Sequence, residues 1–478
     1  MQKSLLIHPH TFNSYDHWYP KTLNAQIHPL VRFFMNMSKD QIIERFSYLN
    51  PSIDKEKLRS LLAYKPKYMQ WAGTDLMHAT TVNGRKEIVV IETNSCPSGQ
   101  KSFPLLDENQ EQGQYFQLIK ESFIPLWKKA KIKNGVTVVF YDKNEMENSG
   151  YAASIADAID GPVYLVYYDK SSLNKLVRIN PIDNVVELLI GKEWKSIRAI
   201  FRYVTQKPWD RLPIISKTLI FNSILACISG GRNKLMAAKA YSFLNSEIRS
   251  SNMKINTPET ICDVSKNEIP LYLKRFDFKG VIKIPYSNAG QGVFIITNES
   301  ELNKFMEADY AYDKFIIQQL VGHREWSSAT DRGSLFQVGT IPSKNNNSYV
   351  FDFRFIVHAT KDGIAPLAMY SRKAGIPLKE NISKGETNEM LLTNLSIKNE
   401  DGSWGSDVSR LVLMDERDFN KLGLGIDELI EGYVQSVLSL IAIDSMAKKL
   451  ISKKMKFKKK LFASLNDDRK LINEFYEN

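Results

Sequence analysis

Hydrophobic positions recur every three to four residues in several parts of the chain, and this spacing predicts amphipathic helices. It is clear in residues 38–49 and 52–64, in a longer stretch at about 108–130, and again from Asp427 onward. Elsewhere the apolar residues form short runs rich in valine, isoleucine and phenylalanine, which are typical of strands. The pattern therefore predicts a mixed α/β chain.

Strand and helix signals alternate in one part of the sequence. Residues 135–141 and 162–168 have the pattern of buried strands, and residues 149–159 between them have that of a helix. A β-α-β order makes the two strands parallel, so a small Rossmann-like domain is predicted, with further strands at 185–191 and 196–203. The segment lacks a Gly-x-Gly-x-x-Gly motif and is not interpreted as a dinucleotide site.

Asn83-Gly84 lies between two β-favouring runs, which is a strong hairpin signal. If these two residues form the whole loop, Asp75 faces Glu92 across the hairpin, and Asn94 lies on the same face as Glu92. Carboxylates placed about 5 Å apart repel each other, and a divalent cation such as Mg²⁺ between them relieves the repulsion. The alternative is an ordinary solvated hairpin whose charges diverge with the twist of the sheet.

Two further segments combine glycine with lysine. Ser229-Gly-Gly-Arg-Asn-Lys234 is a Gly-rich turn that opens a predicted helix, and helix N-termini attract phosphate. Lys283 ends a predicted strand, and the loop after it can close over phosphates. The donors and glycines of this loop are Ser287, Asn288, Gly290 and Gly292. The alternatives are a plain helix start with an incidental lysine and an ordinary glycine-containing hairpin.

Arg354 and Arg372 lie in successive predicted strands. A guanidinium group between apolar neighbours is costly unless it meets an anion, and its planar fork suits phosphate. We therefore expect both arginines to hold a transferring phosphoryl group, with cross-strand salt bridges as the alternative. Arg202, in an earlier strand, is assigned either to a substrate carboxylate or to a surface ion pair.

The composition fits a globular protein without selecting one function. The 478 residues are 43% hydrophobic and 24% charged, a length that corresponds to roughly three domains. Sixty-four Lys and Arg against 53 Asp and Glu give a net charge of +11, which fits a phosphate-handling enzyme and a nucleic-acid binder alike. Three cysteines without framework spacing indicate a reducing, cytoplasmic compartment. We find no apolar run near the roughly 18 residues of a membrane span.

Eight lysines between positions 447 and 460 form a basic run near the end of the sequence. A membrane-surface or RNA-binding helix is one interpretation. The favoured interpretation is the solvated face of a terminal helix, because such runs commonly serve only solubility. Nucleic acid is therefore not expected as a partner.

Together these segments resemble the ATP-grasp superfamily. Ala72-Gly-Thr-Asp75 and Glu92-Thr-Asn94-Ser-Cys-Pro-Ser-Gly99 are similar to the metal-binding end of ATP-dependent carboxylate–amine ligases, nearest in general pattern to the ribosomal-protein–glutamate ligases. In most of that superfamily the two ATP lysines precede the Glu-x-Asn segment, whereas here Glu92 precedes both Lys234 and Lys283. The chain therefore resembles circularly permuted members, such as glutathionylspermidine-synthetase-like proteins and natural-product peptide ligases.

The resemblance implies an α/β ATP-grasp fold, circularly permuted, with a small Rossmann-like domain. The domains implied are residues 1–130 with the metal-binding part of the core, 131–225 as the Rossmann-like domain, 226–410 as the lid and phosphate-binding core, and 411–478 as a helical segment with the basic tail.

The resemblance also implies roles for individual residues. The Mg²⁺ ligands would be Asp75, Glu92 and Asn94. ATP would be bound by Lys234, Lys283, Ser287, Asn288, Gly290 and Gly292, by the adenine hinge Gln318, Gln319, Leu320 and Val321, and by Glu325 at the ribose. Arg354, Arg372 and Asn394 would hold the transferred phosphate, and Ser95, Ser98, Gly99 and Arg202 would contact the substrates. The hinge usually has an acidic residue where this chain has Gln319, so adenine is expected to contact backbone groups.

The activity implied is ATP-dependent ligation of a small-molecule carboxylate to an amine, through an acyl phosphate, with release of ADP and phosphate. ATP and Mg²⁺ are the expected cofactors, and amino acids or peptides are the expected substrates. The alternatives are a kinase on the same fold and a non-catalytic nucleotide-binding protein. Many proteins of this kind dimerise, so a homodimer is an open alternative for the assembly.

Overall fold

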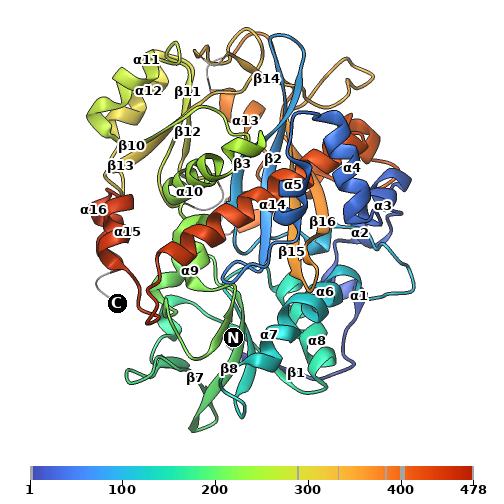
Figure 1. Cartoon of the computed structure of the whole chain (residues 1–478), viewed down its shortest axis with the longest axis vertical. Coiled ribbons are helices and arrows are strands. Elements are labelled where there is room, and N and C mark those ends of the chain that lie inside the picture. The colour runs from blue at the N-terminus through green and yellow to red at the C-terminus, as the bar shows by residue number, and fades with distance from the viewer. Residues whose placement is uncertain (1–3, 288–289, 332, 383–384, 399–403, 476–478) are drawn as a thin grey trace.

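The fold is α/β, with four sheets among the described residues. The computed structural model describes residues 4–287, 290–331, 333–382, 385–398 and 404–475. Figure 1 shows a large mixed sheet at the bottom, called the parallel sheet after its inner strands, the sheet of β10 to β13 at the upper left, and the central sheet beside it. A small sheet pairs β17 (Ser396–Lys398) with β18 (Trp404–Ser406).

The central sheet is antiparallel and combines strands that are far apart in the sequence. Its order is β14-β2-β15-β16-β19, with β3 also paired to β2. Strands from the first, third and fourth of the predicted domains thus share one sheet; the domain boundaries themselves stay a prediction. The strands are β2 (Trp71–Thr81), β3 (Lys86–Asn94), β14 (Leu335–Gln337), β15 (Phe351–Thr360), β16 (Gly363–Lys373) and β19 (Leu411–Val412).

The β2–β3 hairpin differs in detail from the prediction. Its loop is longer than two residues, because the Thr81 N–H donates to the Arg85 carbonyl and Gly84, with φ at +77°, donates to the Thr81 carbonyl. The register is consequently shifted by one residue near the loop. A bulge after Asp75 reverses the shift, so that Asp75 still pairs with Glu92.

The predicted parallel strands lie in a second sheet. β4 is parallel to β5 and β8, and β8 is parallel to β9, while β1 joins the edge antiparallel to β5. The helix between the first two strands begins at Glu145, four residues earlier than expected. The strands are β1 (Ser4–Ile7), β4 (Val136–Tyr141), β5 (Val163–Tyr167), β6 (Val177–Ile179), β7 (Val186–Ile190), β8 (Glu193–Tyr203) and β9 (Leu219–Phe221); the neighbouring helices are α6 (Gly113–Leu118), α7 (Ile124–Lys129) and α8 (Glu145–Ile159).

A third sheet has its own small hydrophobic cluster, which includes Phe276, Ile282 and Ile317. Its order is β10-β13-β11-β12, and two helices, α11 and α12, belong to the same segment. The elements are β10 (Thr260–Ser265), α11 (Ile269–Lys274), β11 (Gly280–Lys283), β12 (Val293–Ile296), α12 (Glu299–Glu307) and β13 (Lys314–Gln319).

α14 (Ile426–Lys449) is the central helix of the molecule and packs against β2, β3 and β15. Its apolar stretch has a mean hydropathy of 1.2 and is long enough to cross a membrane, which corrects the expectation that no such run exists. However, 89% of that stretch is buried inside the protein, as expected for a core helix. The helices around α14 are α3 (Pro29–Met35), α4 (Lys39–Leu49), α5 (Lys55–Leu62), α9 (Ile224–Ala226) and α10 (Lys234–Glu247).

The basic run does not form one helix. α14 ends at Lys449, a turn follows in which Ile451 pairs with Phe457, and α15 begins at Lys459. All eight lysines are exposed, which agrees with a solvated surface. The other helices are α1 (Ser14–His17), α2 (Pro20–Leu23), α13 (Thr387–Leu391), α15 (Lys459–Leu465) and α16 (Arg469–Asn473).

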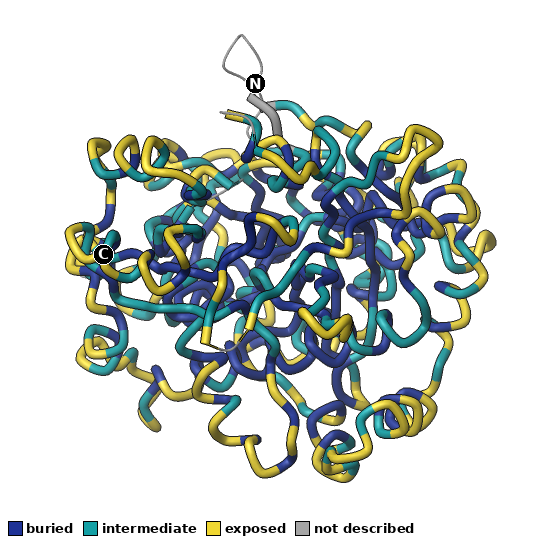
Figure 2. Tube along the Cα trace, turned by 90° about the horizontal axis from the view of Figure 1, so that it is seen from above, coloured by how far each residue is buried: buried dark blue, intermediate teal, exposed yellow. Residues whose placement is uncertain are grey.

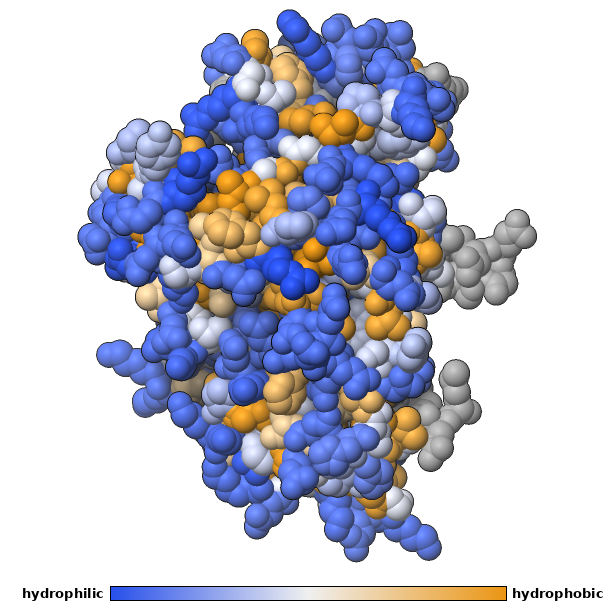
Figure 3. Space-filling model, turned by 90° about the vertical axis from the view of Figure 1, so that its right-hand side faces the viewer, coloured by the Kyte–Doolittle hydropathy of each residue, from blue (hydrophilic) through white to orange (hydrophobic). Residues whose placement is uncertain are grey.

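Burial follows the layers. Figure 2 shows buried residues concentrated in the interior and exposed residues in peripheral loops and helices. On the face in Figure 3, hydrophilic residues cover most of the surface and hydrophobic residues form separate groups. The largest hydrophobic cluster joins the central sheet, the parallel sheet and α14. These two sheets are therefore held together by a continuous apolar interior.

Candidate active site

A cavity lies where the central, parallel and β10–β13 sheets meet. Its empty volume is about 1740 Å³, including its open mouth. Each sheet contributes to its walls: Asp75, Glu92 and Asn94 come from the central sheet, Tyr203 from the parallel sheet, and Lys283 from the third. The hairpin and the lysine strand, separated by nearly two hundred residues, therefore face one space.

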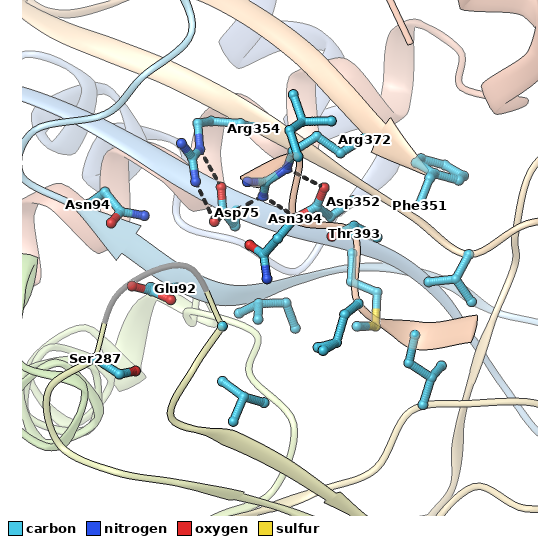
Figure 4. Close-up of a pocket in the computed structure, with 18 of the residues that line it drawn as sticks. Asp75, Glu92, Asn94, Ser287, Phe351, Asp352, Arg354, Arg372, Thr393 and Asn394 are labelled. Carbon is cyan, nitrogen blue, oxygen red and sulfur yellow. Dashed lines mark hydrogen bonds and ion pairs between the residues drawn. The ribbon is translucent and has the colours of Figure 1, made fainter. Parts of the chain in front are cut away.

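Two arginines and two aspartates form a network on the central sheet (Figure 4). Arg354 lies opposite Asp75 and binds it in a bidentate manner, with Nε to Oδ1 at 2.6 Å and Nη2 to Oδ2 at 2.8 Å. Arg372 lies opposite Asp352 and binds it through Nε at 2.9 Å, and its Nη2 lies 3.1 Å from Asp75 Oδ2. Burial would raise the pKa of Asp75, but the two guanidinium groups outweigh it and hold the pKa at about 2. The network as a whole is formally neutral.

The three residues assigned to Mg²⁺ differ in what their oxygens contact. Both Asp75 oxygens are engaged by arginines. By contrast, no described residue donates a hydrogen bond to Glu92, whose nearest cation is Lys234 Nζ at 3.8 Å, or to the Asn94 side chain. Glu92 and Asn94 thus line the cavity with side-chain oxygen atoms that accept no hydrogen bond from the described residues. Within the described ranges, no group of three His, Cys, Asp or Glu side chains could hold a metal on its own.

The two lysines predicted to bind phosphates meet near Glu92. Lys234 is the first residue of α10, after Asn233, whose side chain accepts a hydrogen bond from the Met236 N–H. Its ammonium group lies 3.1 Å from Ser287 Oγ, and its backbone N–H donates to the Pro285 carbonyl. The start of the helix is thereby joined to the loop after β11.

Lys283 is buried with little compensation for its charge. Its side chain is 7% exposed, and Nζ donates to Gln318 Oε1 at 2.6 Å. Burial lowers the pKa of Lys283 to about 8; Glu92 acts in the opposite direction and Lys234 adds to the lowering. No carboxylate of the described chain lies within ion-pair distance of this ammonium group. Such a buried cation is suited to an anionic ligand.

The glycine loop reaches the asparagine that was predicted to act with the arginines. Gly290 has φ at +77°, and a Cβ there would lie 2.4 Å from Asn394 Nδ2. In Figure 4, Asn394 lies between the arginine network and the loop that carries Ser287. Gly292 packs against Ile284, where a Cβ would lie 2.3 Å from Cγ1. Asn288 lies outside the described residues.

Most polar groups of the predicted adenine hinge are already bonded within the protein. Gln318 contacts Lys283, and Gln319 donates from Nε2 to the Gly333 carbonyl. The Leu320 N–H donates to Ser328 Oγ at 2.7 Å, and the Leu320 carbonyl accepts from the Ser328 N–H at 3.0 Å.

Val321 is the exception. Its carbonyl accepts from Gln337 Nε2 at 3.1 Å, whereas none of the described residues accepts from its N–H. Val321 lines the cavity. Of the backbone N–H and carbonyl groups of Leu320 and Val321, the Val321 N–H is therefore the one that could still bind adenine. Glu325 is exposed and does not line the cavity, contrary to its predicted place at a ribose.

Three of the four predicted substrate residues do not reach the cavity. Arg202 is fully buried and donates to the carbonyls of Asn222, Val204 and Ser95 at 2.8–3.3 Å, which corrects both alternatives considered for it. Ser95 is fully buried too, with Oγ 3.3 Å from the Gly231 carbonyl. Gly99 has φ at +150°, and a Cβ there would lie 2.4 Å from Tyr370. Arg202, Ser95 and Gly99 are therefore structural, because polar burial and close packing account for them.

Ser98 does line the cavity. Its Oγ donates to Glu147 Oε2 at 2.8 Å and accepts from Asn144 Nδ2 at 2.9 Å. Glu147 is itself fully buried and also accepts from the N–H groups of Gly99 and Gln100. This carboxylate thus holds the segment after Asn94 against the start of α8.

The cavity also contains three cations that the sequence analysis did not assign, Lys101, Lys143 and Arg232. Lys143 follows β4 and Lys101 lies in a short helical turn, so neither has a motif around it. Arg232 lies within the Gly-rich turn and could have been considered with Lys234. Among the described lining residues, seven Lys and Arg side chains stand against three carboxylates.

Several solved structures share part of this fold at low similarity. A glutathione synthetase-like effector from Globodera pallida has 9% sequence identity and a TM-score of 0.39, over 72% of this chain and 81% of that chain. A RimK domain ATP-grasp protein from Sphaerobacter thermophilus has 12% identity and a TM-score of 0.30, over 49% and 90%. The N5-carboxyaminoimidazole synthetase of Staphylococcus aureus has 9% identity and a TM-score of 0.22, over 59% and 74%. No protein-family profile and no curated protein matches the sequence. At these TM-scores the similarities do not identify the activity of this chain.

Proposed function

We propose that the protein is a circularly permuted ATP-grasp enzyme that uses MgATP to join a carboxylate to an amine. The observation that carries this proposal is the charge of the cavity. The Arg354–Asp75–Arg372–Asp352 network is neutral, so the excess of four positive charges comes from Lys101, Lys143, Arg232, Lys234 and Lys283 against Glu92. An excess of this size in one cavity favours the binding of an anion of comparable charge. A nucleoside triphosphate meets that need.

The order of these groups along the chain supports the permuted form. Glu92 and Asn94 come from the early hairpin, Lys234 and Lys283 follow, and Arg354 and Arg372 come last. The carboxylate and the lysines nevertheless line one cavity. This combination of reversed order and shared site is what the resemblance to permuted ATP-grasp ligases implies.

The residues present fit Mg²⁺ as it is commonly bound beside phosphates. Mg²⁺ is often held by one or two carboxylates, with phosphate oxygens and water completing its shell. Glu92 and Asn94 have oxygens without hydrogen-bond partners in the described chain, so they are the residues that would hold it. Asp75, being engaged by two arginines, orients those arginines. The ion would supply neutralisation of phosphate charge.

The chain's own groups account for binding and positioning. Lys234 and Lys283 would bind phosphate oxygens, and the Val321 N–H would contact the base. Arg354 and Arg372 are fixed in plane by their aspartates at the cavity wall, where they can stabilise charge on the transferred phosphoryl group. In the proposed reaction, a substrate carboxylate oxygen attacks the γ-phosphorus and ADP leaves. An amine then displaces phosphate from the acyl carbon, losing a proton, and an amide forms.

The proposal is tested by measuring ADP release with amino acids, short peptides and polyamines as substrates, followed by identification of the product. We expect an amide, phosphate and ADP in equal amounts. A phosphate ester with no amide would show a kinase on the same fold, and tight nucleotide binding without ADP release would show a non-catalytic protein. Glu92→Gln serves as the matched variant: turnover as fast as in the wild type would contradict the proposed metal site.

A further inference from the structure

One part of the cavity wall is formed by the parallel sheet, whereas Lys234 and Lys283, which face Glu92, lie on α10 and β11. Lys143 and Asn144 follow the carboxyl end of β4, and Tyr203 is the last residue of β8. β4 and β8 are parallel, with Tyr141 paired to Tyr203, so both strands end at the same edge. Open α/β sheets bind ligands in the crevice outside the carboxyl ends of their strands. The position is therefore one at which a ligand is expected.

Lys143 lines this part of the cavity, and its ammonium group has no partner among the described residues. Its side chain is accessible to solvent, and none of the described residues forms a hydrogen bond or ion pair with its ammonium group. The protein around the open cavity partly desolvates the ammonium group and so lowers the pKa of Lys143; the charge of Arg232 adds to the lowering and that of Asp142 opposes it. A lysine held in this way gains an interaction when an anion enters.

Two other cations share this part of the cavity. Lys101 is 6% exposed, and its Nζ donates to Asn144 Oδ1 at 2.8 Å and lies 4.8 Å from the centre of the Tyr19 ring. No described carboxylate lies within 4.0 Å of that ammonium group. Arg232 donates from Nη2 to the Cys96 carbonyl at 3.2 Å, which holds its side chain at the cavity wall.

The acidic residue bonded to this part of the wall does not neutralise these charges. Glu147 is fully buried behind the wall, and its two oxygens accept hydrogen bonds from Ser98 Oγ and from two backbone N–H groups. It is not among the residues that line the cavity. Lys101 and Lys143 therefore remain available to a ligand, and they lie on elements other than α10 and β11, which carry Lys234 and Lys283.

We propose that Lys101 and Lys143, with Arg232 beside them in the cavity wall, form an anion-binding subsite for the substrate other than ATP. The inference rests on the proposed ligase function and adds the substrate class. The substrate held there carries an anionic group, a carboxylate or a phosphate, in addition to any carboxylate that reacts. An acidic amino acid or an acidic peptide has this chemistry, whereas a polyamine does not.

The test uses the purified full chain and matched probe pairs at constant ionic strength. L-glutamate is compared with L-glutamine, and O-phospho-L-serine with L-serine, by calorimetric titration. We expect the acidic member of at least one pair to bind about tenfold or more tightly than its neutral partner, as for a charge-assisted hydrogen bond. The pair that responds distinguishes a carboxylate ligand from a phosphate ligand. Equal binding within both pairs, or no binding by any probe, would overturn the subsite.

Variants locate the effect. Lys143→Gln should lose the preference for the acidic probe by about tenfold, and Lys143→Arg should retain it. Lys175→Gln, which removes an exposed lysine that does not line the cavity, is the control and should bind like the wild type. If Lys143→Gln binds the acidic probe as tightly as the wild type does, the subsite is wrongly placed. Titration of the wild type with Mg-ADP is a separate measurement: its failure would contradict the proposed function, while the amino-acid titrations still decide the subsite.

Discussion

Replacing Lys283 by methionine should change stability and nucleotide binding in ways that can be separated. The ammonium group is buried, and Gln318 is its hydrogen-bond partner among the described residues. In the absence of a ligand it is a cost to the folded state, and with a triphosphate bound it becomes a contact. The same substitution should therefore remove the cost of burying a charge in the ligand-free protein and weaken the binding of the nucleotide.

The magnitude follows from the pKa. A value of about 8 against 10.5 for an unperturbed lysine corresponds to about 3 kcal/mol of destabilisation at pH 7. The pKa is lower in the folded state, so the unfolded chain binds more protons between these values. The destabilisation is consequently full below pH 8 and is lost as the pH rises toward 10.5. Methionine at position 283 removes this destabilisation. It also leaves Gln318 Oε1 without its hydrogen-bond donor, at a cost of about 1–3 kcal/mol that does not depend on pH.

The pH dependence isolates the lysine. Between pH 7 and pH 9.5 the free energy of unfolding of the wild type should rise by about 2 kcal/mol relative to that of Lys283→Met, measured by urea denaturation. At pH 7 the variant should bind Mg-ADP about 30-fold or more weakly, as for loss of a charged hydrogen bond. Lys304→Met, at an exposed position of α12, is the control. An unchanged affinity, or a stability difference that is the same at both pH values, would refute the reasoning.

Three other substitutions test separate parts of the site. Glu92→Gln should abolish the dependence of nucleotide affinity on Mg²⁺, measured with and without EDTA. It should lower the melting temperature only slightly, because the carboxylate has no hydrogen-bond donor in the described chain and its ion pair with Lys234 is long, at 3.8 Å. Gly290→Ala should slow ADP release, because the alanine Cβ would collide with Asn394. The left-handed backbone at this position costs alanine about 1 kcal/mol, so global stability should change little. An unchanged rate would argue against the contact between the loop and Asn394. Arg202→Met should lower the free energy of unfolding by about 3 kcal/mol or more, because three buried carbonyls lose their hydrogen-bond donor. The KM of the folded variant should be unchanged. A raised KM at intact stability would restore a substrate role for Arg202.

Periodicity and local motifs predicted much of the secondary structure. The strands around 136–141 and 163–167, the helix between them and the hairpin ending in Asn94 are determined by short-range patterns. The hairpin loop is one residue longer than predicted, and a bulge near Asp75 compensates for the extra residue in the strand register. Residue types do not reveal such bulges. The long apolar helix Ile426–Lys449 shows the same limit, since composition cannot tell a core helix from a membrane span.

The sequence by itself determined which residues could bind phosphate or Mg²⁺, because glycine turns, strand lysines and a Glu-x-Asn segment are local patterns. Only the tertiary structure decided which of them share a cavity, and it separated Ser98 and Arg354 from Arg202, Ser95 and Glu325. It also brought Lys143 and Lys101 beside them from segments without any motif. The physical reason is that burial and electrostatic pairing depend on contacts between strands distant in sequence. A lone charged residue acquires its role only from the partners that the fold gives it or withholds.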